Sequence, residues 1–298
     1  WPAMNALVKG LLQLVLETRS FRRIRLKVFA RPDQLEDPSV ANFPDASKVM
    51  NQKVNLDWPR RELYGLLWQY LANDTDYGQK FRVGANSALP SIHWTQTEGV
   101  WTVPELMRRN EDAQKQLFHA MTGPWMGRDK RRGFPYSWLP SHLGDARGEV
   151  SPRSFLAAVR HSASDSPRTE QEYLLHYESI KQGVQEASRI RVRELEEDYP
   201  WIKTLFDPLS GITVPCPFDD IRIVWRERKV IDQLRRGIES ATVRLPPLHI
   251  DDGEDGVLID LLDLGLVEKL KDQRINLPDV YRVGYGMGRR GGVKPYSA

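Results

Sequence analysis

The ten residues from Ile24 to Asp33 constrain the fold more than any other stretch of the chain. Apolar and basic side chains alternate along it before it closes on two apolar residues, a pattern that predicts a short strand buried mainly on one face. Pro32 cannot donate a hydrogen bond to a sheet, so the strand should end at Arg31. Ligands bind at the edge of an open α/β sheet where such strands end. Arg31 is therefore the first candidate site residue.

This apolar run, which leads into Arg31 and Asp33, resembles the sensor strand of P-loop ATPases of the AAA-like and STAND group. In that family the arginine faces the terminal phosphate of ATP. The resemblance therefore implies that Arg31 senses nucleotide, with Asp33 in the same motif, and a guanidinium can direct two donors at phosphate oxygens. The residues alone equally allow a solvated arginine that pairs with Asp33 or Asp45.

A second motif is formed by Ser151, Pro152 and Arg153, which predict the start of a helix because serine caps helices and proline favours the first helical position. Arg153 would then stand beside unpaired backbone N–H groups, which attract anions. The motif resembles the arginine of the helical lid, the second sensor of AAA-like ATPases, and so implies a second nucleotide-sensing residue. On the residues alone, Arg153 could instead pair with Glu149 or Asp145.

Composition excludes several classes of protein. The chain has 298 residues, is 40% hydrophobic and 28% charged, and has a mean hydropathy of −0.52, values typical of a folded, water-soluble protein. No run approaches the roughly 18 apolar residues that a membrane span needs, so we expect no membrane partner. The single cysteine, Cys216, excludes an internal disulfide, so we expect a reducing, cytoplasmic setting and a structural role for this residue. The six histidines are scattered, so no metal site is predicted.

The chain begins at Trp1 without a start methionine, which favours a segment of a longer protein. It contains no Gly-x-x-x-x-Gly-Lys-Ser/Thr phosphate loop and no convincing acidic strand for magnesium. The resemblance then implies that ATP and Mg²⁺ bind to the full-length protein. We expect this segment alone to bind neither and to hydrolyse no ATP, and we assign no catalytic residue within it.

Two basic clusters could contact nucleic acid or a protein partner. The first, at 128–132, lies among aromatic residues and could bind phosphates or stack on bases, although a solvated loop is the favoured interpretation. The second, in the glycine-rich end of the chain, could clamp a nucleic-acid backbone or pack on a neighbouring subunit. Alternating Tyr281, Val283 and Tyr285 predict that the first part of this end is ordered. The candidate contact residues are Arg128, Lys130, Arg131, Arg132, Arg282, Arg289, Arg290 and Lys294.

The sequence near the carboxyl terminus has the outline of a winged helix. Residues 255–264 predict an amphipathic helix that ends at Gly265, and 266–270 would then pair with 274–277 as a hairpin. Three aspartates on the helix give it the wrong charge for contact with DNA phosphates. Helical periodicity also predicts helices over about 60–72, 103–122, 169–197 and 219–238.

Together these patterns predict a mixed α/β, mostly helical chain. We expect the end of a P-loop ATPase core over 1–95, a helical lid or connector over 96–240, and a winged helix with a basic tail over 241–298. The resemblance implies the nucleotide-sensing and output part of a bacterial switch ATPase in signalling or defence, with a homo-oligomer or an effector domain as partner in the full-length protein. The alternative is a non-enzymatic winged-helix regulator that binds DNA.

Overall fold

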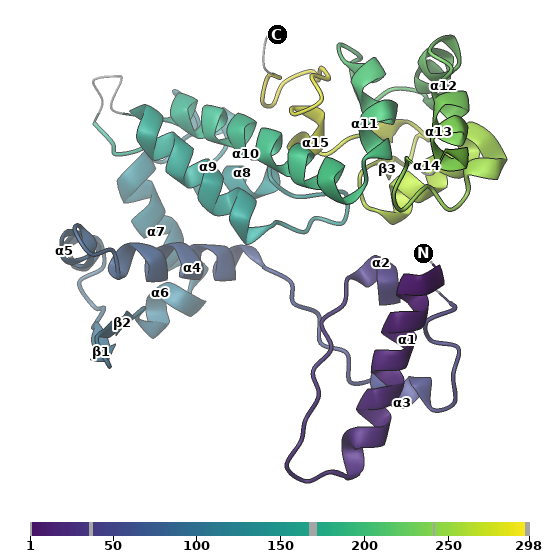
Figure 1. Ribbon diagram of the computed structural model, residues 1–298. Helices are drawn as coiled ribbons and strands as arrows, with labels where there is room; N and C mark the ends of the chain where they lie inside the picture. The colour runs from purple at the N-terminus through teal and green to yellow at the C-terminus, as the bar shows by residue number, and fades with distance from the viewer. Residues whose placement is uncertain (1, 36–37, 167–171, 241, 296–298) are drawn as a thin grey trace. The chain divides into compact units, whose positions relative to one another are not determined.

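The structure is a computed structural model that describes residues 2–35, 38–166, 172–240 and 242–295. The chain is mixed α/β and mostly helical, with 57% helix and two small sheets. It divides into two compact units, Trp1–Leu56 and Asp57–Ala298. The division precedes the helix predicted over 60–72, whereas the sequence patterns had suggested a boundary near residue 95. Each unit is described by itself (Figure 1).

The first unit packs a long helix against two short ones. Val8 and Leu12 of the long helix form a small core with Val40. The strand predicted over 24–30 is not formed: this segment lies outside regular secondary structure, and Phe29 is 78% exposed. A strand needs a pairing partner, and both sheets that the structure describes belong to the second unit. The elements are α1 (Pro2–Glu17), η1 (Thr18–Ser20), α2 (Pro32–Leu35) and α3 (Ala46–Met50).

Pro32 begins a helix rather than ending a strand. It is the first residue of α2, a position where its fixed φ is favourable and its missing N–H costs nothing. The Arg31 N–H donates to Gln34 Oε1 at 3.1 Å, the reciprocal half of a capping box. The same residues that suggested the end of a strand are therefore a helix start.

In the second unit, residues 57–198 form a body of packed helices, which we call the helical body. Its core centres on Tyr64, whose ring stacks on Tyr136 at 4.3 Å between centroids. The buried Gln114 accepts from Tyr136 Oη at 2.8 Å and donates to the Met107 carbonyl at 2.7 Å, so its amide oxygen and nitrogen are both paired. The elements are α4 (Arg60–Ala72), α5 (Gly78–Ala88), β1 (Thr95–Thr97), β2 (Val100–Thr102), α6 (Glu105–Arg109), α7 (Glu111–Thr122), η2 (Lys130–Arg132), α8 (Pro135–Ser141), α9 (Pro152–Asp165) and α10 (Tyr177–Asp198).

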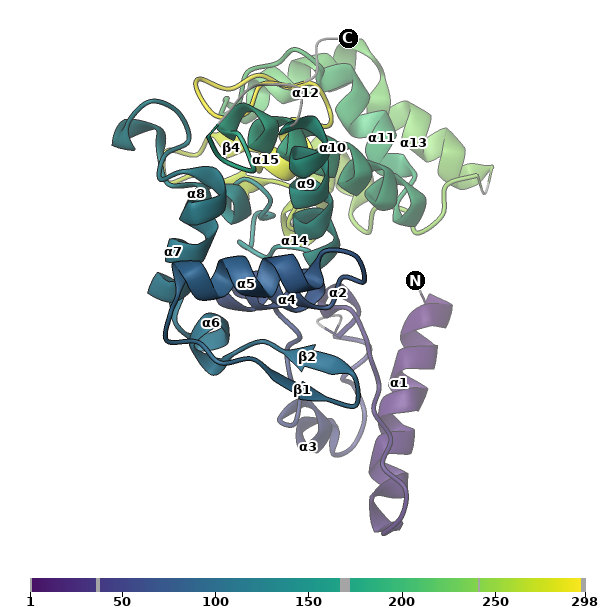
Figure 2. The same cartoon turned by 90° about the vertical axis from the view of Figure 1, so that its left-hand side faces the viewer.

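Helices α9 and α10 lie side by side along the body (Figures 1 and 2). Their backbones approach closely at Gly183, where an added methyl group would overlap the Ala158 carbonyl oxygen and Ser162 Oγ. The start of α9 at Pro152 agrees with the sequence pattern. Helix α10 begins at Tyr177, later than expected, and residues 169–171 of the predicted helix lie outside the described residues.

Residues 199–277 form a second part, the C-terminal module. The helix predicted over 219–238 is two helices, separated at Lys229, which has a left-handed backbone with φ of 52°. The predicted helix, glycine and hairpin near the carboxyl terminus are present: α14 is followed by Gly265 with φ of 70°, and Lys269 pairs with Ile275. The elements are α11 (Trp201–Phe206), η4 (Asp207–Leu209), α12 (Phe218–Glu227), α13 (Val230–Glu239), η5 (Ile250–Asp252), α14 (Gly253–Asp263), β3 (Glu268–Lys269) and β4 (Ile275–Asn276).

A third short segment joins the hairpin of this module. Cys216 forms an antiparallel bridge with Ile275, with N–H to carbonyl distances of 3.0 and 2.8 Å. The order across the three segments is therefore Cys216, β4, β3. Burial raises the pKa of the Cys216 thiol to about 11, so it stays protonated near neutral pH and is a structural side chain.

Residues 278–295, which we call the tail, contact both the helical body and the C-terminal module. The tail begins with α15 (Asp279–Arg282), which packs on α10, and Ser188 Oγ donates to the Val280 carbonyl at 2.6 Å. Further along, Gly288 N–H donates to the Ile212 carbonyl at 2.7 Å. The structure describes the tail as far as residue 295 (yellow in Figure 1).

Candidate functional site

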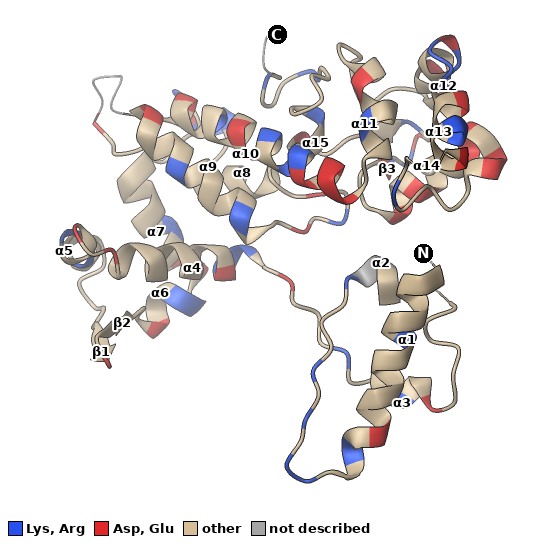
Figure 3. Ribbon diagram, viewed as in Figure 1, with Lys and Arg blue, Asp and Glu red and all other residues tan. Residues whose placement is uncertain are grey.

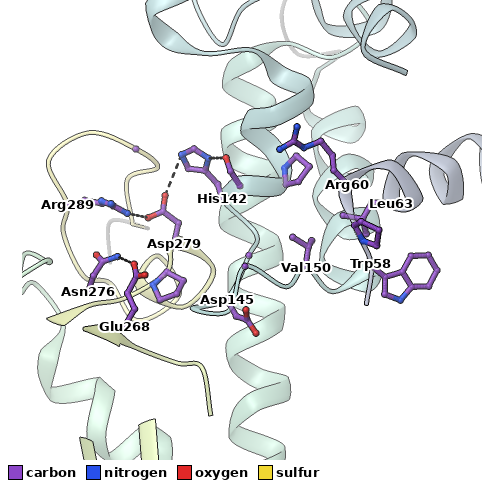
Figure 4. Close-up of a pocket in the computed structure, with 17 residues that line it drawn as sticks. Trp58, Arg60, Leu63, His142, Asp145, Val150, Glu268, Asn276, Asp279 and Arg289 are labelled. Carbon is purple, nitrogen blue, oxygen red and sulfur yellow. Dashed lines mark hydrogen bonds and ion pairs between the residues drawn. The ribbon is translucent and has the colours of Figure 1, made fainter. Parts of the chain in front are cut away.

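A cleft of about 730 Å³ lies where the helical body, the C-terminal module and the tail meet (Figure 4). The body contributes Trp58 and Arg60 at the start of α4, and the end of α8 with the loop that follows it. The hairpin of the module contributes Glu268 and Asn276, and the tail lines the remaining side. A volume of this size is within the range of about 300–1,000 Å³ that is usual for small-molecule sites.

His142, at the end of α8, is oriented by its own helix. Its Nδ1 lies 2.7 Å from the Trp138 carbonyl oxygen, so Nδ1 carries the proton, and the two rings stack at 3.8 Å between centroids. Nε2 then lies 3.6 Å from Asp279 Oδ2 (Figure 4). Burial is the main cause that lowers the pKa of His142 below its ordinary value, so the ring is neutral at pH 7.

Asp279 is the centre of a buried ionic cluster on the tail. Its Oδ1 accepts from Arg282 Nε at 2.8 Å and lies 3.4 Å from Arg289 Nη1. Arg282 is fully buried, and its other two nitrogens donate to the carbonyls of Met287 at 2.8 Å and Val293 at 2.6 Å. Arg282 therefore folds the tail on itself and does not belong to an exposed basic surface, contrary to the role in partner contact that the sequence suggested.

Glu268 and Asn276 face each other across the hairpin. They are register partners on β3 and β4, and Asn276 Nδ2 donates to Glu268 Oε1. Asn276 is 3% exposed, and its Oδ1 has no hydrogen-bond partner within the described part of the chain. A buried acceptor without a donor costs free energy, so this oxygen is a place where a ligand could supply one.

The first sensor candidates, Arg31 and Asp33, lie in the first unit. Arg31 is half-buried and caps α2 through its backbone, as described above. The side chain of Asp33 lies outside the described residues. The residues that line the cleft in the described part of the chain all belong to the second unit.

Arg153, the second sensor candidate, stands in the first turn of α9. Its side chain is 74% exposed, and its Nη1 lies 2.6 Å from Glu194 Oε1 on α10. The partner is therefore a residue of the neighbouring helix, whereas Glu149 and Asp145 were the partners considered from sequence. Asp145 instead accepts from the backbone N–H groups of Arg147 and Glu149 in its own turn.

The first basic cluster is an exposed loop. Arg128 and residues 130–132 are all exposed, and Asp129 Oδ1 caps the short helix η2 by accepting from the Arg131 N–H at 2.9 Å. The aromatic residues nearby pack among themselves: Trp125 lies 5.0 Å from Phe134 between ring centroids. In the second cluster Arg289, Arg290 and Lys294 are exposed, unlike Arg282.

Three of the four acidic side chains of α14 have partners within the module. Arg226 Nε lies 2.9 Å from Glu254 Oε1, and Arg222 pairs with Asp255, so α12 neutralises the first turn of α14 (Figure 3). Further along, Asp260 accepts from His249 through both carboxylate oxygens. These contacts leave α14 as a packed, acidic helix.

Sequence reasoning did not single out His142, Asp279, Asn276 or Glu268. They come from separate parts of the chain, the end of α8, the two strands of the hairpin and the tail, and the tertiary fold brings them to one cleft. No group of three or more histidine, cysteine, aspartate or glutamate residues that could hold a metal ion occurs in the described ranges. Within the same ranges no helix is both long enough and apolar enough to cross a bilayer.

Comparisons with family models, with curated proteins and with solved structures find no match to this chain.

Proposed function

We propose that this chain is the nucleotide-sensing and output part of an ATP-dependent switch, in which the cleft couples ligand state to the arrangement of the C-terminal module. The observation that supports the proposal is that one cleft is lined by the helical body, the module and the tail. A ligand that contacts all three binds one arrangement of them better than others. It shifts their equilibrium by that difference in affinity.

The cleft offers two cationic groups to an anionic effector such as a nucleotide. Arg60 and Arg289 both line it, and arginine binds phosphate oxygens through two parallel donors. The 298 residues contain no phosphate loop, so in this proposal the loop and the Mg²⁺ site are supplied outside them. ATP turnover then belongs to the full-length protein, with a homo-oligomer or an effector domain as its partner.

Arg31 and Arg153 remain the proposed nucleotide-sensing residues. The exposed ion pair between Arg153 and Glu194 suits this role, because a surface pair contributes little stability and can be exchanged for a phosphate. Arg153 also lies in the first turn of a helix, where the backbone favours anions.

The C-terminal module is proposed to be a winged helix that docks within the protein. Helices α12, α13 and α14, a hairpin and a third strand-like segment at Cys216 are the parts of such a module. The helix that precedes the hairpin, α14, carries four acidic residues and no lysine or arginine, so it offers no cationic group to DNA phosphates. This favours an intramolecular output role over the alternative, a DNA-binding regulator.

The test replaces each sensor by alanine in the full-length protein. Arg160→Ala is the matched control for Arg153→Ala, because Arg160 is an exposed arginine on the same helix. Loss of a charged hydrogen bond of about 1.5–3 kcal/mol should weaken the ATP-dependent response about 10- to 100-fold in the sensor variants, as read by ATP turnover and ATP-dependent assembly. An ATP response equal to that of the control in both Arg31→Ala and Arg153→Ala would contradict the proposed sensing.

The DNA-binding alternative makes a different prediction. Its support is the exposed basic loop at 128–132 together with the exposed arginines of the tail. Binding of duplex DNA that weakens steeply with added salt, and that is lost when the basic loop is neutralised, would favour it. An affinity that is weak and indifferent to the loop would leave the switch as the better proposal.

A further inference from the structure

The tail side of the cleft holds more positive charge than its carboxylate neutralises. Asp279 is shared by two arginines, and the buried Arg282 takes the shorter contact, 2.8 Å against 3.4 Å for Arg289. The remaining donors of Arg282 are used by two backbone carbonyls. One positive charge is therefore left over, and it belongs to Arg289, whose side chain is 38% exposed and lines the cleft.

The body side of the cleft carries a second cation, Arg60. It is the first residue of α4, where unpaired backbone N–H groups add to the favourable potential for an anion. Among the described residues its guanidinium lies over the Tyr136 ring, 5.7 Å from the centroid, and has no carboxylate partner. Figure 4 places Arg60 and Arg289 on different walls of the cleft.

The acidic residues that line the cleft are engaged in local hydrogen bonds. Asp145 accepts two backbone N–H groups at 2.9 Å, and Glu268 accepts from Asn276. In these bonds the partners are backbone N–H groups and an amide, not the arginines of the cleft. Asn276, which also lines the cleft, has a buried Oδ1 without a partner in the described chain, so this oxygen can accept a hydrogen bond from a ligand.

We propose that this cleft binds a small phosphate ester that carries hydroxyl groups, with its phosphate paired to Arg289 and a hydroxyl donated to Asn276 Oδ1. The proposal rests on the switch function and deepens it by naming the chemistry of the ligand. Because Arg289 lies on the tail and Asn276 on the hairpin of the module, the ligand joins these two parts. Arg60 adds attraction from the helical body.

The coupling follows from what the ligand changes. A phosphate on Arg289 competes with the long contact to Asp279 and leaves the shorter contact to Arg282 in place. The tail therefore keeps its fold while its exposed arginine acquires a new partner. Binding at this position tightens the tail against the hairpin without requiring that the buried ionic cluster open.

The experiment measures binding of ribose 5-phosphate, inorganic phosphate and ATP to the 298-residue chain by titration calorimetry. Variants Arg289→Gln and Asn276→Leu test the two contacts, and Arg290→Gln is the matched control, because Arg290 is the exposed neighbour that does not line the cleft. Ribose 5-phosphate should bind, and should lose about 10- to 100-fold in affinity in Arg289→Gln, with at most a few-fold change in Arg290→Gln. Thermal melts establish that each variant is folded.

The three probes separate the parts of the proposal. Tighter binding of ribose 5-phosphate than of inorganic phosphate, lost in Asn276→Leu, supports the hydroxyl contact, and equal affinities would overturn it. No saturable binding of any probe, or equal losses in Arg289→Gln and Arg290→Gln, would overturn the site. Binding that depends on Arg289 in a full-length protein whose state does not respond to ATP would preserve the site and reject the proposed switch.

Discussion

Arg282 should be among the most costly residues of the tail to replace. Its side chain is fully buried, and three of its nitrogens donate hydrogen bonds, one to Asp279 and two to backbone carbonyls of the tail. Replacement by methionine keeps an apolar side chain of similar length but removes all three donors. Two carbonyls and one buried carboxylate then lose a partner at once.

The expected magnitude follows from the loss of one member of a buried ion pair, which costs about 3–5 kcal/mol. Arg289 lies 3.4 Å from the same carboxylate and compensates in part, so we expect the lower end, about 3 kcal/mol. At about 2–4 °C per kcal/mol for a domain of 150–250 residues, the melting temperature should fall by about 6–12 °C. Urea unfolding of the chain measures the free energy directly.

Arg290→Met is the control, because Arg290 is exposed in the same tail and should change stability by no more than about 0.5 kcal/mol. The double variant Asp279→Leu with Arg282→Met should be less unstable than the sum of the two single variants, since removing both charges leaves neither one buried alone. A loss in Arg282→Met no larger than that of the control would refute the assignment of Arg282 as the residue that folds the tail.

Four further substitutions have expected outcomes. Gly183→Ala should destabilise by about 1–3 kcal/mol in urea melts because its methyl group has no room between α9 and α10, whereas Gly84→Ala, in an open helix position, should stabilise by up to about 1 kcal/mol. The pKa of His249 is raised by its hydrogen bond to Asp260, so the stability that this bond contributes is complete below about pH 6.5 and is lost as pH rises through the raised pKa. His249→Gln should remove this dependence of stability on pH. If the dependence persists in the variant, another group causes it. The pKa of His142 is lowered by burial, so stability should fall as pH drops below about 6.5 toward that lowered pKa. In melts recorded from pH 7 to 5, His142→Gln should reduce this loss of stability. An unchanged loss in the variant would contradict the assignment of a neutral, buried His142 ring.

Local signals in the sequence were sufficient where a helix start or a tight turn decides the structure. Pro152 marks the beginning of α9, and Gly265 marks the end of α14 because its backbone needs a positive φ. The hairpin that follows also has the expected pairing. In each case residues within a few positions of one another fix the backbone, so a single sequence contains the information.

The sequence misled where the outcome depends on distant partners. The alternation over 24–30 is compatible with a strand, but no strand of the described chain pairs with it, and Pro32 starts a helix. The break at Lys229 is a left-handed residue without a glycine or proline to announce it. Both errors arise because tertiary contacts outweigh the local pattern of side chains in deciding which secondary structure a segment forms.

The candidate cleft illustrates the same limit. Arg282 and Arg289 look alike in a glycine-rich basic tail, yet one is buried against Asp279 and the other lines the cleft. His142 lies far from both in sequence and has no neighbour that suggests a site. Only the fold of the tail over the body and module separates a structural arginine from one that is available to a ligand.

The most direct test of the account is hydrogen exchange of the tail in the full-length protein, with and without ATP. Backbone bonds from 287–288 tie the tail to itself and to the module, including Gly288 N–H to the Ile212 carbonyl at 2.7 Å. If ligand state sets the arrangement of tail and module, exchange at these amides should slow with ATP, and the effect should disappear in Arg289→Gln but persist in Arg290→Gln. Exchange that is the same with and without ATP would contradict the central claim that the cleft is the coupling site of a switch.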